Sequence, residues 1–524
     1  MIQLPAPLYA VYHSKWESLQ SLPLAERFWA KDATLWANSD PVAVASMLGW
    51  VDVLPKMLAR VAEITEFVED VRSAGFDRVV LAGMGGSSLA PYVFAQAFGV
   101  QPGGLPLTVL DSTHPDTVRA VREIATDRTL FIVASKSGST AEPTAFDRYF
   151  FEFAADPSRF VAITDPGSPF AQSAEARGFR KVFLNYAEIG GRYSALSFFG
   201  LVPAALLGHD VAALITAAMV YATDAEDAFR IGTALGVAAQ HGRDKLTLLT
   251  APETASFGLW LEQLVAESTG KQGVGIFPVA GEGPLASDAY GDDRLFATFG
   301  VPAPDAAPAT ITLSAIDSAP ALVREFLRWE IATAVSGIVL GINPFDQPNV
   351  QESKDVTKAV LAQVDATGTL PAEPDLLAAE AIDLAAALSD VAPPAYLALQ
   401  AYLHETPELN SALAELQAAL AAHFRVATSC GYGPRFLHST GQYHKGGPKH
   451  GVFLQLVDDP QTDDAIPGQS ATWRQFVRAQ AIGDAEALRT KGLRVIRISL
   501  GSDPAAAVRS LLSRVSPETS RTDS

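Results

Sequence analysis

The hydrophobic positions change their spacing along the chain, and the first spacing is helical. Residues 1–75 carry apolar side chains three and four residues apart, as amphipathic helices do. Ser39-Asp40-Pro41 is a typical helix start within this segment, because Ser and Asp cap a first turn and Pro fits its first position. We therefore predict a helical N-terminal segment over 1–60, and helix continues into the region that follows.

Short continuous apolar runs come next, and they are typical of parallel strands buried on both faces. Helical or loop sequence separates these runs. We predict strands at 77–83, 105–112, 129–135, 159–165 and 181–185, and then at 245–251, 274–279 and 309–315, with a long helix after the last. The fold class is therefore α/β, with two doubly wound parallel-sheet domains at 61–205 and 206–360.

The last third of the chain has a mixed pattern. Residues 360–422 are rich in alanine, and we predict helix there. Strand-like runs at 423–429, 451–457 and 493–500 alternate with a glycine-rich loop and helices. We expect 361–515 to be a helical and mixed C-terminal region that packs on the site, followed by a polar, disordered end.

Composition and charge narrow the possible functions. The 524 residues are 48% hydrophobic, which is enough for more than one domain with its own core. A net charge of −19 disfavours nucleic acid and anionic membranes as partners. The single cysteine, Cys430, excludes an intramolecular disulfide framework. The sequence shows no secretory signal and no apolar stretch long enough to span a bilayer, so we expect a cytoplasmic protein.

A glycine-rich loop, GMGGSS (83–88), follows the first predicted strand and leads into helical sequence. Such a turn presents free backbone N–H groups and the positive end of the helix dipole, which suit phosphate. We expect the glycines to admit a ligand that contacts Gly86 and Ser87. Two alternatives are a tight turn that binds nothing and a dinucleotide site. Gly83 and Gly85 match the start of GxGxxG, and Asp111 ends a later strand, but a serine replaces the third glycine.

A second loop, SKSGST (135–140), follows another predicted strand and favours phosphate over both alternatives. It gathers hydroxyl groups and one ammonium group within six positions: Ser135, Lys136, Ser137, Ser139 and Thr140. Hydroxyls and N–H groups donate to phosphate oxygens, and lysine supplies charge. A dinucleotide-binding fold needs no second loop of this kind.

Together these two loops resemble the sugar-phosphate isomerase (SIS) fold. GGRYSALSFFGL (190–201), LEQLVAESTGK (261–271) and INPFDQPNVQESK (342–354) follow in the order found in glucose-6-phosphate isomerases. GYGPRFLHSTGQYHKGGP (431–448) is similar to the isomerase half of bifunctional transaldolase/glucose-6-phosphate isomerases. The resemblance covers roughly 60–500 and implies reversible conversion of glucose 6-phosphate to fructose 6-phosphate, with no cofactor. It also implies a homodimer and, because the transaldolase half is absent, a functional pairing with a separate transaldolase.

The chemistry needs a base, a group that stabilises the enediolate, and help in opening the sugar ring. The resemblance implies that Glu267 is the base and that Gln263, one helical turn earlier on the same face, also lines the sugar site. It implies that Arg192 stabilises the enediolate oxygens. It further implies that Lys354 contacts the ring oxygen or the phosphate.

The ring-opening histidine departs from the family pattern, because residues 272–345, where the family carries it, contain no histidine. The candidates are His438, which we prefer, and His444. Together with His450 they match no helical face and no tetrahedral ligand set, so we predict no metal. In many such isomerases this histidine comes from the neighbouring subunit.

Two further functions stay open at this point. One is a non-catalytic SIS module that senses a sugar phosphate, and the other is the same isomerase with added activity on mannose 6-phosphate. A sensor needs no base, so the joint presence of Glu267, Arg192 and Lys354 argues against it.

Overall fold

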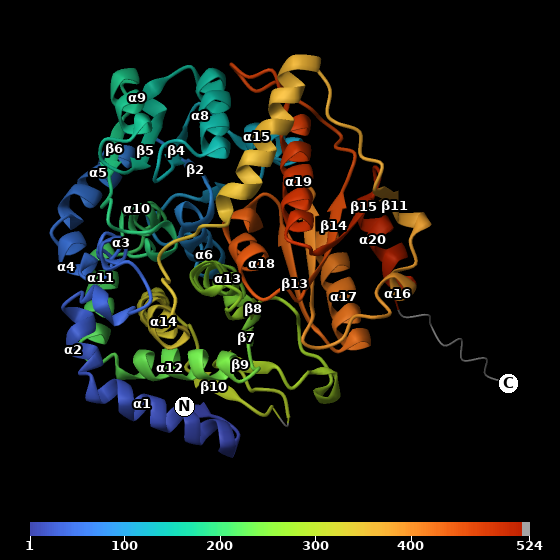
Figure 1. Ribbon diagram of the computed structural model, residues 1–524. Coiled ribbons are helices and arrows are strands. Elements are labelled where there is room, and N and C mark those ends of the chain that lie inside the picture. Colours follow the sequence, from blue (N-terminus) through green and yellow to red (C-terminus); the bar gives the residue numbers. More distant parts are fainter. Residues whose placement is uncertain (306, 516–524) are drawn as a thin grey trace.

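The computed structural model describes residues 1–305 and 307–515, and within them three five-stranded sheets are covered by helices (Figure 1). The predicted α/β fold class with parallel sheets is confirmed. The third sheet lies in the region that was expected to be a helical and mixed extension. The disordered end predicted from the sequence begins at 513. That prediction is wrong for its first residues, since Ser513 ends the helix α20 (Pro504–Ser513) and Val515 is buried, and the remainder, 516–524, lies outside the described residues.

The first sheet has the strand order β3-β2-β4-β5-β6, and all its pairs are parallel. Its strands are β2 (Arg78–Gly83), β3 (Leu107–Leu110), β4 (Thr129–Ala134), β5 (Phe160–Thr164) and β6 (Lys181–Leu184). Its helices are α6 (Leu89–Ala97), α7 (Pro115–Ile124), α8 (Ala141–Ala154), α9 (Pro169–Arg177) and α10 (Phe198–Leu206). Gly83 pairs with Ala134, so the loops after β2 and β4 leave the sheet side by side.

The second sheet has the order β1-β10-β9-β7-β8, in which β1 is antiparallel to β10 and the other pairs are parallel. Its strands are β1 (Ile2–Gln3), β7 (Lys245–Thr250), β8 (Phe277–Val279), β9 (Arg294–Phe299) and β10 (Thr310–Leu313). The sequence analysis assigned no strand to β9, although it is buried along its length between β7 and β10. The helices are α11 (Val211–Ala222), α12 (Glu226–Gln240), α13 (Ser256–Thr269) and α14 (Ala319–Leu340).

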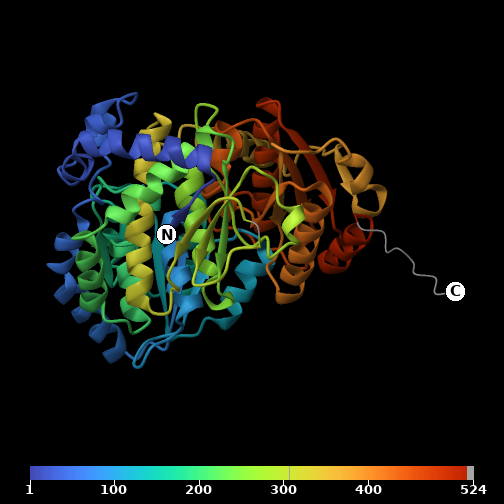
Figure 2. The same ribbon diagram turned by 90° about the horizontal axis from the view of Figure 1, so that it is seen from below.

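Short helices of the N-terminal segment cover the first two sheets. They are α1 (Ala6–Ser21), α2 (Leu24–Trp29), α3 (Pro41–Ala45), α4 (Val53–Leu58) and α5 (Val61–Ser73). The predicted helix start is confirmed, since the Asp40 carboxylate accepts a hydrogen bond from the Val42 N–H at the first turn of α3. Figure 2 shows α1 lying across this part of the molecule, where it packs on α12.

The third sheet has the order β11-β15-β14-β12-β13, and all its pairs are parallel. Its strands are β11 (Leu376–Ala378), β12 (Tyr396–Tyr402), β13 (Ala427–Tyr432), β14 (Gly451–Val457) and β15 (Arg494–Ser499). Its helices are α15 (Val350–Thr367), α16 (Leu384–Ala387), α17 (Pro407–Phe424), α18 (Gly441–Gly446), α19 (Trp473–Thr490) and α20 (Pro504–Ser513).

The prediction of helix throughout 360–422 is wrong at β11 and at β12, and β12 is a buried strand between β13 and β14. Tyr396 and Ala398 pack in one apolar cluster, whereas Leu397 and Leu399 pack in another on the opposite face. Alanine favours helix by propensity, but here burial on both faces of a sheet decides the conformation.

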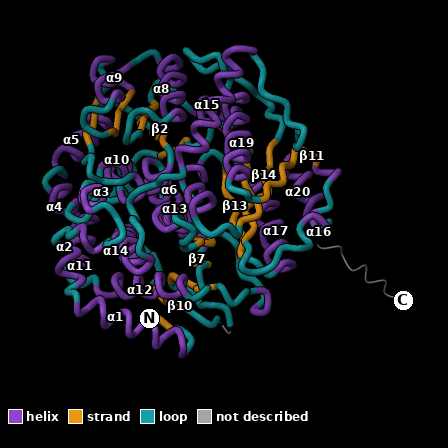
Figure 3. The backbone as a smooth tube through the Cα atoms, viewed as in Figure 1, coloured by secondary structure: helices purple, strands orange, loops and turns teal. Residues whose placement is uncertain are grey.

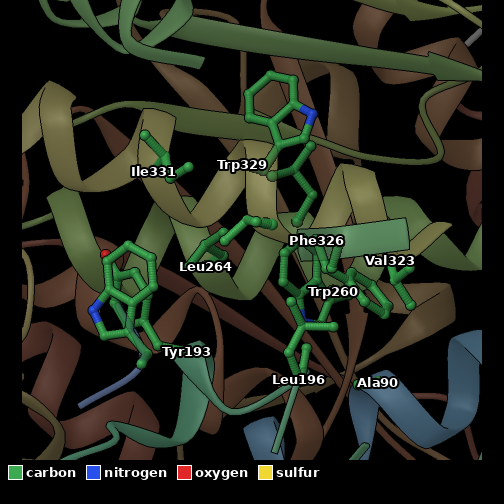
Figure 4. Close-up of a cluster of buried hydrophobic side chains, with 14 of the residues drawn as sticks. Ala90, Tyr193, Leu196, Trp260, Leu264, Val323, Phe326, Trp329 and Ile331 are labelled. Atoms are coloured by element: carbon green, nitrogen blue, oxygen red, sulfur yellow. The ribbon is translucent and has the colours of Figure 1, made fainter. Parts of the chain in front are cut away.

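Helix α13 lies near the middle of the molecule, with strands of the three sheets around it (Figure 3). Its residues divide among three faces because a helix repeats every 3.6 residues. Trp260 and Leu264 pack in the apolar core (Figure 4). Gln263 and Glu267 lie one turn apart on a second face, and Glu262 lies on a third. Each of these three faces contacts a different part of the protein.

Among the helices of the described residues, none is long and apolar enough to cross a membrane.

Candidate functional site

A cavity of about 420 Å³ lies where the loops after β2 and β4 meet α13. Its lining contains most of the residues singled out from the sequence, namely Gly86, Ser87, Ser135, Lys136, Ser137, Thr140, Arg192, Gln263, Glu267, Lys354 and His438. Ser139 lines a neighbouring cavity that shares Ser137, Thr140, Lys354 and His438 with this one. His444 lines neither. The structure thus brings together side chains from loops and helices that belong to all three sheets.

The glycines of the first loop are required by packing within the protein, which we did not expect. A Cβ atom on Gly86 would collide with the carbonyl group of Gly191, and one on Gly85 would lie 2.6 Å from the Gln263 side-chain nitrogen. Gly85 also has a φ of +54°, which favours glycine. Protein therefore lies where their side chains would be. Both glycines also line the cavity, and that they admit a ligand stays a prediction.

The second loop offers hydroxyl donors at the start of α8. Ser135 Oγ is buried and has no hydrogen-bond partner among the described residues. Thr140 precedes the first turn of α8, and its hydroxyl does not cap the helix. The first N–H groups of α8 therefore face this loop with the positive end of the helix dipole. Such a set of neutral donors suits a phosphate group.

Lys136 lies in the same loop, but its charge is already paired. Its ammonium group forms an ion pair with Asp165 and donates to the carbonyl oxygen of Ala187 at 3.0 Å. It lines the cavity without offering an unpaired cation. Its predicted role in binding a phosphate is weaker than the sequence indicated.

Glu267 and its neighbours form the chemical centre of the cavity. Gln263 Nε2 donates to Glu267 Oε2 at 3.1 Å, and Arg192 Nη1 lies 3.5 Å from Glu267 Oε1. The Arg192 side chain is only 2% exposed and the Glu267 side chain only 11%. A carboxylate, an amide and a permanent cation therefore face one another in a nearly dry place, where electrostatic interactions are stronger than in water.

The loop 343–347 holds Arg192 in its orientation. Arg192 Nη2 donates to the carbonyl oxygens of Pro344 and Asp346, and Nη1 donates to Gln347 Oε1 at 2.9 Å. Lys271 donates to the same loop at Asp346, and burial, with the neighbouring Arg192, lowers the pKa of Lys271 to about 8. Gln347 also lines the cavity, and the sequence analysis did not select it.

Lys354 enters the cavity from α15, beside the third sheet. Its side chain is half-buried, and it forms no ion pair within the described part of the chain. It lines both the main cavity and the neighbouring one. Lys354 is therefore placed to meet an anionic or strongly polar group of a ligand.

His438 and His444, the two candidate histidines, have different surroundings. His438 Nε2 lies 3.1 Å from Glu142 Oε1, and its carbonyl oxygen accepts a hydrogen bond from Gln263 at 2.7 Å. His444 is buried in an aromatic cluster, with its Nδ1 2.9 Å from the Tyr396 hydroxyl. Burial, with the adjacent Lys445, lowers the pKa of His444 well below its ordinary value. The prediction that His444 contacts substrate is therefore wrong, because this side chain is enclosed in the core.

Glu142 is a site residue that the sequence analysis did not select. It lies in the first turn of α8, accepts hydrogen bonds from His438 and from Gln480 Nε2 at 2.7 Å, and is buried. Burial alone would raise the pKa of Glu142, but the charge and hydrogen bond of His438 outweigh it and hold that pKa below its ordinary value. The available signal was an acidic residue two positions after SKSGST.

Comparisons with known proteins agree with this arrangement. Residues 37–230 match the family model described as Phosphoglucose isomerase. A curated glucose-6-phosphate isomerase from Synechococcus sp. (strain JA-3-3Ab) is 30% identical over 359 residues, which cover 55% of this chain and 66% of the relative. The chain belongs to the phosphoglucose isomerase family.

Two further proteins resemble part of this chain. A glucose-6-phosphate isomerase from Thermus thermophilus is 33% identical over 269 residues, covering 48% of this chain and 63% of that protein. A crystal structure of a glucose-6-phosphate isomerase from Chlamydia trachomatis is 20% identical, with a TM-score of 0.48 over 64% of this chain and 78% of that one. The matches thus span 66% and 63% of the length of these two curated relatives.

The matched region does not hold the whole cavity. Both loops and Arg192 lie within residues 37–230, whereas Glu267, Lys354 and His438 lie beyond them. The roles of these three residues therefore rest on the geometry of the cavity and on the motifs in the sequence.

Proposed function

We propose that this protein interconverts glucose 6-phosphate and fructose 6-phosphate by moving one proton between C2 and C1 through a cis-enediolate. One observation carries the proposal: Glu267, Arg192 and Gln263 face one another in a cavity that also contains the SKSGST loop. The cavity volume of about 420 Å³ lies within the range usual for small-molecule sites, about 300–1,000 Å³.

In this proposal Glu267 is the base. It takes the proton from C2 of the open-chain aldose and returns it to C1, while the hydroxyl proton on O2 passes to O1, so no atom is gained or lost. Arg192 stabilises the negative charge that develops on O1 and O2, and its fixed cation does so without exchanging a proton. Gln263 keeps the carboxylate of Glu267 in position through the 3.1 Å hydrogen bond.

The phosphate is held at the start of α8. Ser135, Ser137 and Thr140 supply hydroxyl groups, and the helix supplies N–H groups and its dipole. Ser87 completes this set from the neighbouring loop. Lys136 belongs to this loop, but its charge is not used to hold the phosphate, since Asp165 pairs with it.

His438 opens the ring by giving a proton to the ring oxygen and taking one from O1. Glu142 orients the imidazole through the 3.1 Å contact to Nε2. Lys354 assists by contacting the ring oxygen or the phosphate. No step in this scheme requires a cofactor.

The test is a coupled assay of fructose 6-phosphate conversion in the presence of EDTA, with wild type and Glu267→Gln. We expect wild-type turnover that falls about a hundredfold or more in the variant, as for loss of a general base. Absence of wild-type turnover, together with thermal stabilisation by sugar phosphates, would instead indicate the sensor. Turnover that survives the substitution would remove Glu267 as the base. Mannose 6-phosphate, added as an alternative substrate, tests the broader activity.

The expected partners belong to the same proposal. A homodimer, a functional pairing with a separate transaldolase and a cytoplasmic location follow from the resemblance to the family. Because His438 reaches the cavity of its own chain, catalysis does not require a histidine from a second subunit. Light scattering after size-exclusion chromatography, with turnover measured on each fraction, tests the oligomeric state and whether it matters.

A further inference from the structure

A second cavity lies against another face of α13, and none of its lining residues lines the first. Its volume is about 520 Å³, compared with about 420 Å³ for the cavity that contains Glu267. Residues from α6, α13, α17 and β13 form its walls, so it lies where helices of all three sheets meet. Ligand sites are common at such junctions.

Most of the wall is apolar or neutral. Leu89, Leu259 and Leu413 line it, together with the ring of Tyr432. Burial raises the pKa of the Cys430 thiol to about 12, so this group is uncharged. A ligand of this cavity therefore needs an apolar or aromatic body.

The charged groups in the wall are mainly acidic. Glu253, Glu262 and Glu405 line the cavity, and Arg435 is the only Lys or Arg among the described residues of its wall. Arg435 is shared between Asp111, with two hydrogen bonds of 2.7 and 2.9 Å, and Glu405, with one of 3.3 Å, so it does not balance the charge of Glu253 or Glu262. The cavity consequently carries an excess of negative charge.

Glu262 is the deepest of these carboxyl groups. The residue is 5% exposed, and Ser439 Oγ donates to its Oε1 at 3.1 Å. Within the described residues its Oε2 has no hydrogen-bond partner. Burial raises the pKa of Glu262 to about 7, against the opposing effects of Ser439 and Arg435, because its negative charge is incompletely compensated.

We propose that this second cavity binds a small organic cation, with an ammonium group at Glu262 and an apolar or aromatic body against Leu259, Leu413 and Tyr432. Oε2 is open to the cavity, where the ammonium donates to it and supplies the missing countercharge. Such a site is separate from the sugar cavity, and its occupant requires no isomerase activity to bind.

Isothermal titration with benzylamine tests the proposal, and benzyl alcohol is the neutral probe of the same shape. We expect wild type to bind benzylamine at one site and to bind benzyl alcohol at least tenfold more weakly. Glu262→Gln keeps the acceptor for Ser439 but removes the charge, and is expected to weaken benzylamine binding at least tenfold. Glu267→Gln, which changes the sugar cavity instead, is the matched control and should bind benzylamine as wild type does.

A second variant, Ala414→Trp, tests the proposal even if Glu262→Gln does not fold. Ala414 lines the same cavity at an exposed position, so Ala414→Trp fills it from the solvent side and should abolish benzylamine binding. The proposal is overturned if wild type does not bind benzylamine, if benzyl alcohol binds equally well, or if Ala414→Trp binds as wild type does. Loss of benzylamine binding in Glu267→Gln, or competition by fructose 6-phosphate, would place the amine in the sugar cavity and would also overturn it.

Discussion

The buried carboxyl group of Glu262 predicts an unusual dependence of stability on pH. Its ordinary pKa is 4.5, and burial raises it to about 7 in the folded protein. Below pH 4.5 the group is protonated in both the folded and the unfolded chain, so it contributes no difference. Between pH 4.5 and 7 the unfolded chain loses the proton while the folded chain keeps it. The free energy of unfolding therefore falls as the pH rises through this window.

The size of the effect follows from the shift. From 4.5 to about 7, at about 1.4 kcal/mol for each pH unit, the full penalty is about 3 kcal/mol above pH 7. Glu262→Gln has nearly the same shape and cannot ionise. Relative to wild type, we expect the variant to gain about 1 kcal/mol from this source at pH 5 and about 3 kcal/mol at pH 8. The change between the two pH values is the test, because any fixed cost of the amide cancels.

Urea unfolding followed by tryptophan fluorescence at pH 5, 6.5 and 8 measures this difference. Glu253→Gln, at an exposed position in the wall of the same cavity, is the matched control and should follow wild type at each pH. If wild type and Glu262→Gln keep a constant difference across the three pH values, the reasoning is refuted. Glu262 would then titrate alike in the folded and unfolded chain.

Three other substitutions test the site itself. Glu142→Gln removes the charge that orients His438, so kcat should fall about tenfold or more with little change in KM, and an unchanged kcat in steady-state assays would speak against this role. Gly86→Ala should cost about 3 kcal/mol or more of unfolding free energy through its collision with Gly191, whereas Gly191→Ala, which meets nothing within 4 Å, should cost much less. Thermal melts that rank the two variants the other way would contradict the packing argument. His444→Phe should lose about 1 kcal/mol of stability with its hydrogen bond but keep kcat/KM within about threefold, and a loss comparable to that of His438→Ala would return this residue to the site.

The sequence predicted those parts of the fold that are encoded locally. The strands β2 and β4 read as continuous apolar runs because both faces are buried, and the GMGGSS and SKSGST loops follow their carboxyl ends. The resemblance to the family selected Gln263 and Glu267, helical spacing placed them on one face, and a hydrogen bond joins them in the structure. The strand β12 was not predicted, because its alanines favour helix. Its strand conformation follows from the apolar clusters that pack on its two faces, and these are formed by residues distant in the sequence.

The separation of His438 from His444 could not be read from the sequence. The two residues lie six positions apart in one glycine-rich segment, yet one faces the cavity and the other faces the aromatic core. What decides between them is the packing of α18 against α13, which places Tyr443 and His444 among the rings of Phe277 and Tyr396. Contacts between residues so distant along the chain carry no local signal.

The packing of the third sheet against the second explains why the site includes residues outside 37–230, the part of the chain that matches the family model. Arg294 of β9 and Glu282 form a buried ion pair at 2.8 Å, and Glu282 also accepts hydrogen bonds from the backbone and side chain of Thr428 in β13. Breaking such a pair by removing one partner leaves an unpaired buried charge, so the second and third sheets are held in a fixed relation. That relation sets where the segment after β13 runs, and hence where His438 meets Glu142. The proposed donors for a phosphate lie on loops of the first sheet, but the position of the histidine is set by the contact between the other two sheets.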